Sequence, residues 1–218
     1  MPTLLTPLQD GPVVTVPAWV TDNASFLRWA ESDQAPERGK YGFFQGELWV
    51  DHTMELLLHN LIKTAIGFEV MTWAKAHGLG QFYSDGMLFS CPEIELSSEP
   101  DGIFVTKESL ALKDVWFKNG LHSRVMFGVP DIVLEVISKS SVKKDTVTLR
   151  KLYHEAGIPE YWLVDSREKE PTLQVLRWTE AQYVSVKPQA GWIKSSVLRG
   201  RFRLIVDAEA ERVELEGK

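Results

Sequence analysis

Two apolar segments on either side of a helical stretch constrain the fold of this chain more than any other feature. Residues 131–138 read DIVLEVIS and residues 160–165 read EYWLVD, so both are apolar on the two faces of an extended strand. Such segments are typical of central strands that are covered on both sides. The stretch 140–157 between them is typical of a helix that is capped by serine and ended by glycine. This order predicts a parallel strand pair joined by a helical crossover.

The rest of the chain alternates between strand and helix patterns. We expect helices at 21–30 and 53–77, a helical turn at 107–112, hairpins at 41–50 and 173–186, strands at 81–83, 87–90 and 102–105, one or two strands within 193–206, and a loop or strand at 113–128. The fold class is therefore α/β, with an α+β mixed sheet. We expect three segments: an N-terminal extension at 1–40, extended at first and then carrying the short helix, a main domain at 41–206, and a C-terminal tail at 207–218.

Composition limits the location and the partners of the protein. A chain of 218 residues with 44% hydrophobic content can bury a sizeable core. It has no apolar run of about 18 residues and no signal-peptide pattern, and Cys91 is its single cysteine. These features predict a cytoplasmic protein that does not enter a membrane. The net charge of −6 argues against a general nucleic-acid coat, but a nuclease that gathers carboxylates around a metal is compatible with it.

Two carboxylates lie at positions that suggest a metal site, one within an apolar strand, where burying a charge is costly, and one at the start of a neighbouring strand. Glu135 lies in the middle of an apolar strand, where a charge must be paired or bound to a cation. Asp101 follows Pro100 at the start of a neighbouring strand. Carboxylates on adjacent strands can share one Mg²⁺, which prefers oxygen ligands and keeps bound waters. Such a water can attack a phosphodiester, which suggests nuclease chemistry.

Each of these residues also has a structural interpretation. Glu135 can be a member of an ion pair without a metal, and Asp101 can be a turn residue before Gly102. Asp131 lies about 13 Å along the strand from Glu135, too far to share one ion, so it is either structural or a support for the site.

The arrangement of Asp101 followed by Glu135-Val136-Ile137 on a later strand resembles the PD-(D/E)XK motif of restriction-type nucleases. The chain also resembles the Uma-type family of that superfamily, in residues 130–138, in Lys144-Asp145 and in residues 149–165. Residues 46–49 and 99–105 and the first long helix fit the same pattern, so the resemblance covers about 41–206. It implies a restriction-endonuclease-like core, with a central mixed β-sheet flanked by helices, and metal-dependent cleavage of DNA.

The resemblance also implies roles for particular residues. Asp101 and Glu135 would be metal ligands, with the backbone carbonyl of Val136 as a third. An acidic residue from the first long helix would join them, and Glu55 is the candidate. The implied cofactor is Mg²⁺, for which Mn²⁺ would substitute.

The lysine of the motif is missing, because Ile137 occupies its position. In related proteins this role moves to the following helix, where Lys151 is the candidate. Helical spacing predicts that Lys151 shares a face with Lys144, Thr148 and Glu155. The alternative is that Lys151 is an ordinary surface residue, or that its basic run contacts phosphates.

Three functions remain open at this point. The first is a Mg²⁺-dependent endonuclease acting on DNA. The second is a degenerate, non-catalytic member of the fold that acts as a binding or assembly module. The third is a structural homodimer, although a nuclease that cuts both strands is also expected to be a homodimer. Glu55, His59 and Lys63 are spaced to share one helix face, and they either belong to the site or form a solvated stripe.

Overall fold

The computed structural model describes residues 3–5, 14–36, 39–51, 55–168 and 170–218, and the chain falls into two compact units. The first unit consists of Met1–Met54, Leu88–Glu99 and Phe117–Gly128. The second unit consists of Glu55–Met87, Pro100–Trp116 and Val129–Lys218. The two units are interleaved along the sequence, a division that the expected single domain at 41–206 did not include.

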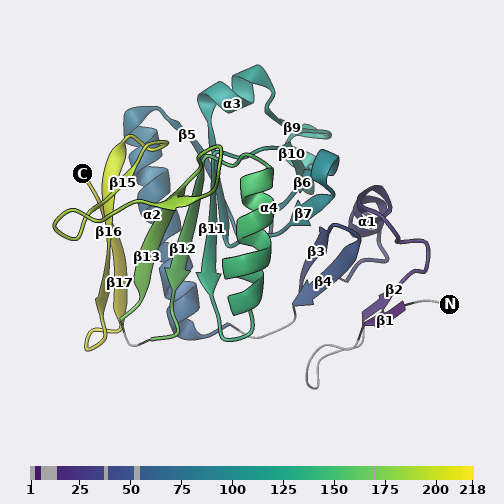
Figure 1. Cartoon of the computed structure of the whole chain (residues 1–218), viewed down its shortest axis with the longest axis horizontal. Helices are drawn as coiled ribbons and strands as arrows, with labels where there is room; N and C mark the ends of the chain where they lie inside the picture. Colours follow the sequence, from purple (N-terminus) through teal and green to yellow (C-terminus); the bar gives the residue numbers. More distant parts are fainter. Residues whose placement is uncertain (1–2, 6–13, 37–38, 52–54, 169) are drawn as a thin grey trace. The chain divides into compact units, whose positions relative to one another are not determined.

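The first unit is built on a β-sheet and one short helix (Figure 1). Its elements are β1 (Thr3–Leu5), β2 (Val14–Val16), α1 (Asn23–Ala30), β3 (Lys40–Phe44), β4 (Glu47–Asp51), β6 (Leu88–Cys91), η1 (Pro92–Ile94), β7 (Leu96–Ser98), η2 (Gly120–His122) and β10 (Val125–Gly128). The sheet strands follow the order β4-β3-β7-β6-β10, and β1 pairs with β2. The expected hairpin at 41–50 is confirmed as β3–β4, and the expected helix at 21–30 is confirmed as α1, which the side chain of Asp22 caps.

The expected extended leader contains the paired strands β1 and β2. Among the prolines of this leader, Pro2, Pro7 and Pro12 lie outside the described residues. The start of the first long helix at 53–54 also lies outside them.

The second unit carries the parallel strand pair that the sequence predicts. Its elements are α2 (Leu57–His77), β5 (Gly80–Ser84), β8 (Gly102–Thr106), α3 (Lys107–Leu112), β11 (Ile132–Ile137), α4 (Leu149–Glu155), β12 (Glu160–Asp165), β13 (Thr172–Arg177), β14 (Val184–Ser185), β15 (Ile193–Ser195), β16 (Gly200–Asp207) and β17 (Arg212–Gly217), and β9 (Val115–Phe117) spans its boundary with the first unit. The main sheet has the order β14-β13-β12-β11-β8-β5. Because β11 is parallel to β12 and antiparallel to β8, the sheet is mixed, as expected.

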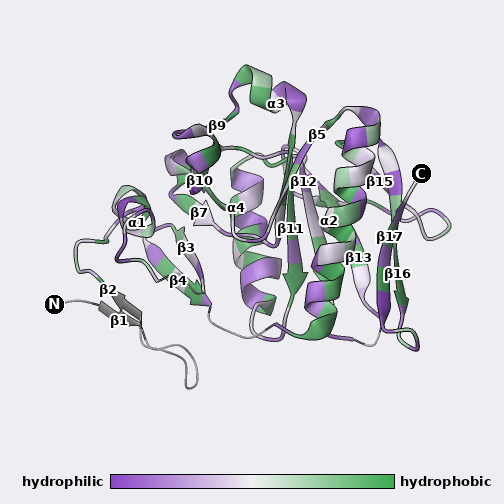
Figure 2. Cartoon of the chain, turned by 180° about the vertical axis from the view of Figure 1, so that it is seen from behind, coloured by the Kyte–Doolittle hydropathy of each residue, from purple (hydrophilic) through white to green (hydrophobic). Residues whose placement is uncertain are grey.

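Helices cover both faces of this main sheet, with α4 in front and α2 behind in the view of Figure 1. One face packs on α2 through a core that includes Ile66, Leu134 and Trp162. On the other face, the rings of Tyr153 in α4 and Tyr161 in β12 meet edge to face, with centroids 5.0 Å apart. All six residues of β11 are buried, and Figure 2 draws this strand largely in the hydrophobic colour. The apolar character that predicted a central strand is thus explained by burial on both faces.

The ends of the helices agree with the glycine signals in the sequence. Gly78 ends α2 with a φ of 65°, and Gly157 follows α4 with a φ of 81°, a backbone region that favours glycine. The helix α2 begins only at Leu57, so Glu55 lies before it rather than on it. Among the described residues, no helix combines the length and the apolar character that crossing a membrane requires.

Two other segments differ in detail from the patterns. The expected strands at 81–83 and 87–90 are present as β5 and β6, but they join different sheets on either side of a turn at Asp85-Gly86. The strand β17 lies in the stretch expected as a C-terminal tail, and it pairs along its length with β16.

The helical crossover contains one irregular turn. Lys144–Thr148 form a π-helical segment directly before α4. A π turn holds one residue more than an α turn, so it rotates the residues after it by about 100° relative to those before it. This rotation decides which lysine of the crossover faces the strands.

Candidate metal and carboxylate site

Asp101 is fixed at the junction of β8 and β11. It directly precedes β8, its side chain is 4% exposed, and its Oδ2 accepts a hydrogen bond of 2.7 Å from the backbone N–H of Val136. The interaction expected at Val136 was a metal bond from its carbonyl oxygen, whereas the contact observed here uses its N–H group. The bond holds the Asp101 carboxylate beside the strand that carries Glu135.

His59 of α2 brings a second element to Asp101. Its Nε2 lies 3.4 Å from Asp101 Oδ2 and 3.8 Å from Glu55 Oε1. One ligand atom from each of these three residues lies within 4.8 Å of the other two. Glu55 reaches this cluster from the segment just before α2. The structure therefore joins two of the expected site residues, Asp101 and Glu55, through a histidine.

The Nε2 atom of His59 is the least satisfied polar atom of this cluster. It is buried and has no hydrogen-bond partner among the described residues. A buried polar atom without such a partner is costly, and a cation placed between one imidazole nitrogen and two carboxylates would satisfy it. The donor set fits a divalent metal ion. Because one donor is nitrogen, the set suits a transition ion such as Mn²⁺ better than Mg²⁺, which prefers oxygen.

Lys63 provides positive charge next to this cluster. Its Nζ lies 2.6 Å from Glu55 and 2.6 Å from Asp85. Burial acts to lower the pKa of this lysine, but hydrogen bonds to Asp85 and Glu55, together with attraction to the charges of Asp85 and Asp101, outweigh it and leave the pKa above its ordinary value. Lys63 therefore stays protonated and holds Glu55 near His59. The interpretation of Glu55, His59 and Lys63 as a solvated stripe does not fit, because His59 is buried.

Glu135 is a buried carboxylate with two partners from the crossover. It is 2% exposed, and its Oε1 accepts a hydrogen bond of 2.8 Å from the hydroxyl of Tyr153. Its Oε2 lies 3.4 Å from Nζ of Lys144. The strand position that looked costly in the sequence is therefore stabilised by an ion pair and a tyrosine. These contacts do not bring Glu135 into the cluster of Glu55, His59 and Asp101.

Lys144 links Glu135 to a further buried acid, Asp145. The Lys144 Nζ atom lies 3.0 Å from Asp145 Oδ1, and Asp145 is 1% exposed. Burial acts to lower the pKa of Lys144, but attraction to Glu135 and Asp145, and more weakly to Asp101, raises the pKa well above its ordinary value. Burial raises the pKa of Asp145, although Lys144 and Ser141 oppose that rise. The buried ammonium of Lys144 therefore lies close to the carboxylates of both Glu135 and Asp145.

Lys151, the lysine expected at the site, is an exposed residue of α4. Among the described residues it forms no hydrogen bond or ion pair with Asp101 or Glu135. The π-helical turn separates Lys151 from Lys144, so the two lysines do not share the face that regular helical spacing predicts. Lys144 is the lysine that lies at Glu135.

Asp131 has a structural position. Its Oδ2 accepts a hydrogen bond of 2.7 Å from the N–H of Thr106, and its Oδ1 accepts one of 3.0 Å from the hydroxyl of Ser109. These bonds tie the start of β11 to the first turn of α3. Of the two roles expected for Asp131, structural or supporting the site, these contacts agree with the structural role.

Glu160 is a buried acid that the sequence patterns did not single out. Its carboxylate accepts hydrogen bonds from the Trp162 indole, the Ser195 hydroxyl and the N–H groups of Ser196 and Val197. These contacts connect β12 to the segment after β15, so Glu160 is structural. The signal that could have indicated it was a glutamate at the start of an apolar strand, the same signal that singled out Glu135.

Comparisons with known proteins agree with this fold. A family model named Uma2, described as "Putative restriction endonuclease", matches residues 24–207. Among solved structures, the chain is similar to a crystal structure titled "a putative nuclease belonging to DUF820" from Anabaena variabilis. That similarity has a TM-score of 0.61 and 15% identity, and it covers 83% of this chain and 91% of that one. No curated protein matches the chain. The expected restriction-endonuclease-like core is confirmed at the level of the fold.

Proposed function

The chain belongs to the Uma2 family, and on that premise we propose that it is a metal-dependent endonuclease that hydrolyses phosphodiester bonds in DNA. The observation that carries the proposal is the buried Nε2 of His59, which has no hydrogen-bond partner among the described residues and lies 3.4 Å from Asp101 Oδ2. A divalent cation bound there would give this nitrogen a partner together with carboxylate oxygens of Asp101 and Glu55.

In this proposal Glu55, His59 and Asp101 hold the divalent ion. Such an ion, when bound, lowers the pKa of a water and offsets the negative charge of the pentavalent transition state. The N–H of Val136 keeps Asp101 directed at the site, and Lys63 keeps Glu55 there. Mn²⁺ and Mg²⁺ are the ions to be tested, with Mn²⁺ favoured by the imidazole ligand.

Glu135 and Lys144 supply the remaining chemistry. We assign Glu135 to orienting the attacking water and accepting its proton, because the Tyr153 hydroxyl fixes its carboxylate. We assign to Lys144 the stabilisation of charge on the phosphate, which is the role that the missing lysine of the motif would have. The proposal thus replaces Lys151 with Lys144 and keeps Asp101, Glu135 and Glu55 as site residues.

A second candidate is a non-catalytic nuclease fold that acts as a binding or assembly module. The observation that favours it is Ile137, which is buried at the position where the motif has lysine. This candidate requires that Lys144 does not substitute for that lysine. It predicts DNA binding or assembly without hydrolysis.

Cleavage of supercoiled plasmid DNA separates the two candidates. The proposal predicts nicked and linear products with Mn²⁺ or Mg²⁺, none with EDTA, and none for Asp101→Asn. An exposed acid of the same unit, Glu168→Gln, is the matched control and should cleave like the wild type. Absence of cleavage under every metal condition by a folded wild-type protein would favour the non-catalytic module.

The proposal includes a homodimer, because two copies of one site can cut the two strands of a duplex. The mass of the free protein and of its DNA complex, measured by light scattering, tests this part. A monomer in both samples would exclude the homodimer without excluding nicking of one strand.

A further inference from the structure

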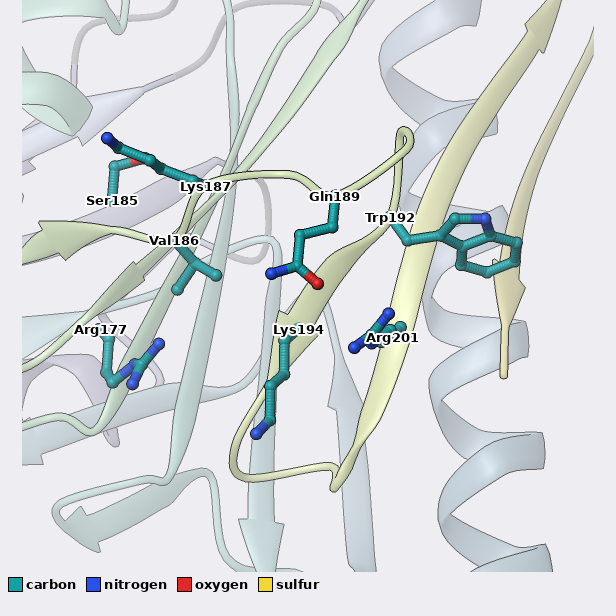
Figure 3. Close-up of a pocket in the computed structure, with 8 residues that line it drawn as sticks. All are labelled: Arg177, Ser185, Val186, Lys187, Gln189, Trp192, Lys194 and Arg201. Atoms are coloured by element: carbon teal, nitrogen blue, oxygen red, sulfur yellow. The ribbon is translucent and has the colours of Figure 1, made fainter.

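A cavity with a strongly basic lining lies on the second unit, between β13, β15 and β16 (Figure 3). It has a volume of about 390 Å³, and its charged lining residues are Arg177, Lys187, Lys194 and Arg201. We call this cavity the basic pocket. None of its lining residues is acidic, although the chain as a whole has a net charge of −6. The positive charge is therefore a local feature of this surface.

A second cavity of about 460 Å³ lies next to the basic pocket. The two cavities share Lys194 and Arg201, and the second adds Arg199 and Lys218. Six cationic residues therefore contribute to the lining of the two cavities. A surface of this kind can contact several charges of an extended anion.

The cations of the basic pocket lack acidic partners. Within the part of the chain that the structure describes, Arg177, Lys187, Lys194 and Arg201 form no ion pair. Nearby arginines differ, since Arg203 lies 2.6 Å from Glu216. An arginine or lysine without a carboxylate partner keeps its capacity to bind an external anion.

Two of these cations face each other directly. Lys194 of β15 and Arg201 of β16 are opposite residues in the antiparallel register. Like charges in such a pair destabilise a sheet. In Figure 3 the side chains of Arg177, Lys194 and Arg201 project toward the same space, whereas the Lys187 ammonium points away from it. An anion in that space would offset the repulsion between Lys194 and Arg201.

The basic pocket is separate from the candidate site formed by Glu55, His59, Asp101 and Glu135. Arg177 lies opposite Glu160 in the sheet, and Glu160 lies opposite Ile132. Glu135 is three residues further along β11, or about 10 Å along the strand, and two strands away from β13. The basic pocket therefore cannot hold the phosphate that is cleaved at the carboxylate site. It can hold another part of the same polyanion.

We propose that the basic pocket binds the sugar–phosphate backbone of a DNA strand at a distance from the bond that is cut. This inference rests on the proposed nuclease function, because that function supplies the polyanion. Arginine matches phosphate through a planar fork of donors, and lysine through a point charge, so the lining suits phosphates without reading bases.

Fluorescence anisotropy with a labelled duplex oligonucleotide in EDTA tests the inference without cleavage. The test variant is Lys194→Ala/Arg201→Ala, and the control is Lys75→Ala/Lys107→Ala, which removes the same charge from exposed lysines elsewhere on the second unit. The test variant should bind roughly tenfold to a hundredfold more weakly, with a salt slope shallower by about 0.9 for each lost contact. The control should bind like the wild type. Thermal unfolding should show that the test variant is at least as stable as the wild type.

Several results would overturn the inference. The first is that the wild type does not bind the duplex, and the second is that the wild type and the test variant bind it with equal affinities and salt slopes. The third is that inorganic phosphate or polyglutamate binds the basic pocket as tightly as the duplex does. The plasmid assay with metal is read separately. If the wild type does not cleave DNA but its binding depends on Lys194 and Arg201, the nuclease proposal is refuted and the proposal for the basic pocket is supported. If the wild type cleaves DNA but its binding does not depend on these two residues, the proposal for the basic pocket is refuted and the nuclease proposal is supported.

Discussion

The ammonium of Lys144 lies 3.4 Å from Oε2 of Glu135, and both side chains are largely buried. The same ammonium lies 3.0 Å from Asp145 Oδ1. Lys144 therefore neutralises the carboxylate that stands in the middle of the central strand. The motif lacks a lysine at position 137, and this contact places one beside Glu135 from the crossover instead.

Lys144→Met should lower the cleavage rate by about a hundredfold to a thousandfold, the usual effect of removing a group that stabilises transition-state charge. Lys151→Met should cleave like the wild type, because Lys151 is exposed. Single-turnover rates on plasmid DNA measure both effects, with circular dichroism to show that each variant is folded. Equal losses in the two variants, or a loss in Lys151→Met alone, would contradict the assignment.

Metal ions should stabilise the native protein, and Mn²⁺ should do so more than Mg²⁺. A ligand that binds only the native state at a hundredfold excess over its Kd adds about 2.7 kcal/mol to the free energy of unfolding. The effect should disappear in His59→Ala, because the variant lacks the nitrogen ligand. Thermal unfolding over a metal titration measures it, with His77→Ala as the control for an exposed histidine. An unchanged metal response in His59→Ala would exclude His59 as a ligand.

Glu160→Gln should destabilise the fold by about 1–3 kcal/mol, because it removes a charged acceptor from buried donors. Two of these donors are the Ser195 hydroxyl at 2.7 Å and the Trp162 indole at 3.0 Å. Urea unfolding measures the loss. The exposed Glu168→Gln should change the free energy of unfolding by no more than about 0.5 kcal/mol. If both variants were equally stable, the buried network would contribute nothing measurable.

The thiol of Cys91 should stay protonated and unreactive in the folded protein. Burial, with a smaller contribution from Glu93, raises its pKa to about 12. Since only the thiolate is a good nucleophile, a disulfide reagent at pH 8 should label this single cysteine only after denaturation. Rapid labelling of the native protein would show that the thiol is accessible.

The same pKa shift sets a dependence of stability on pH. Between the ordinary thiol pKa, about 9, and about 12, the unfolded chain loses this proton and the folded chain keeps it. The contribution of Cys91 to stability should therefore be complete at neutral pH and fall by about 1.4 kcal/mol for each unit of pH in that window. The difference in unfolding free energy between wild type and Cys91→Ala measures it, and a difference independent of pH would contradict it.

The central strands were predictable because burial on both faces leaves a continuous apolar pattern. β11 and β12 match the segments 131–138 and 160–165 closely, and their parallel pairing follows from the helical segment between them. The Uma-type family and the restriction-endonuclease-like fold, both suggested by motifs along these strands, are confirmed. The division into two units was not predictable, because short strands such as β5 and β6 carry no sign of the sheet that they join.

The candidate site was only partly predictable, for reasons of helix geometry. Asp101 and Glu135 could be found because an acid next to or within an apolar strand is unusual. Lys144 could not be preferred to Lys151, since the π-helical turn that rotates the helix leaves no clear signal in the sequence. The histidine at the site was ambiguous as well, because helical spacing alone does not tell a buried face from a solvated one.

The central claim is that Glu55, His59 and Asp101 hold the metal ion of a nuclease. A crystal structure of the protein with Mn²⁺, using the anomalous signal of the ion, tests this most directly. We predict an anomalous peak bonded to His59 Nε2 and to carboxylate oxygens of Asp101 and Glu55, and no such peak in crystals of Asp101→Asn. A peak at other residues, or no peak at saturating Mn²⁺ with and without a DNA duplex, would contradict the claim.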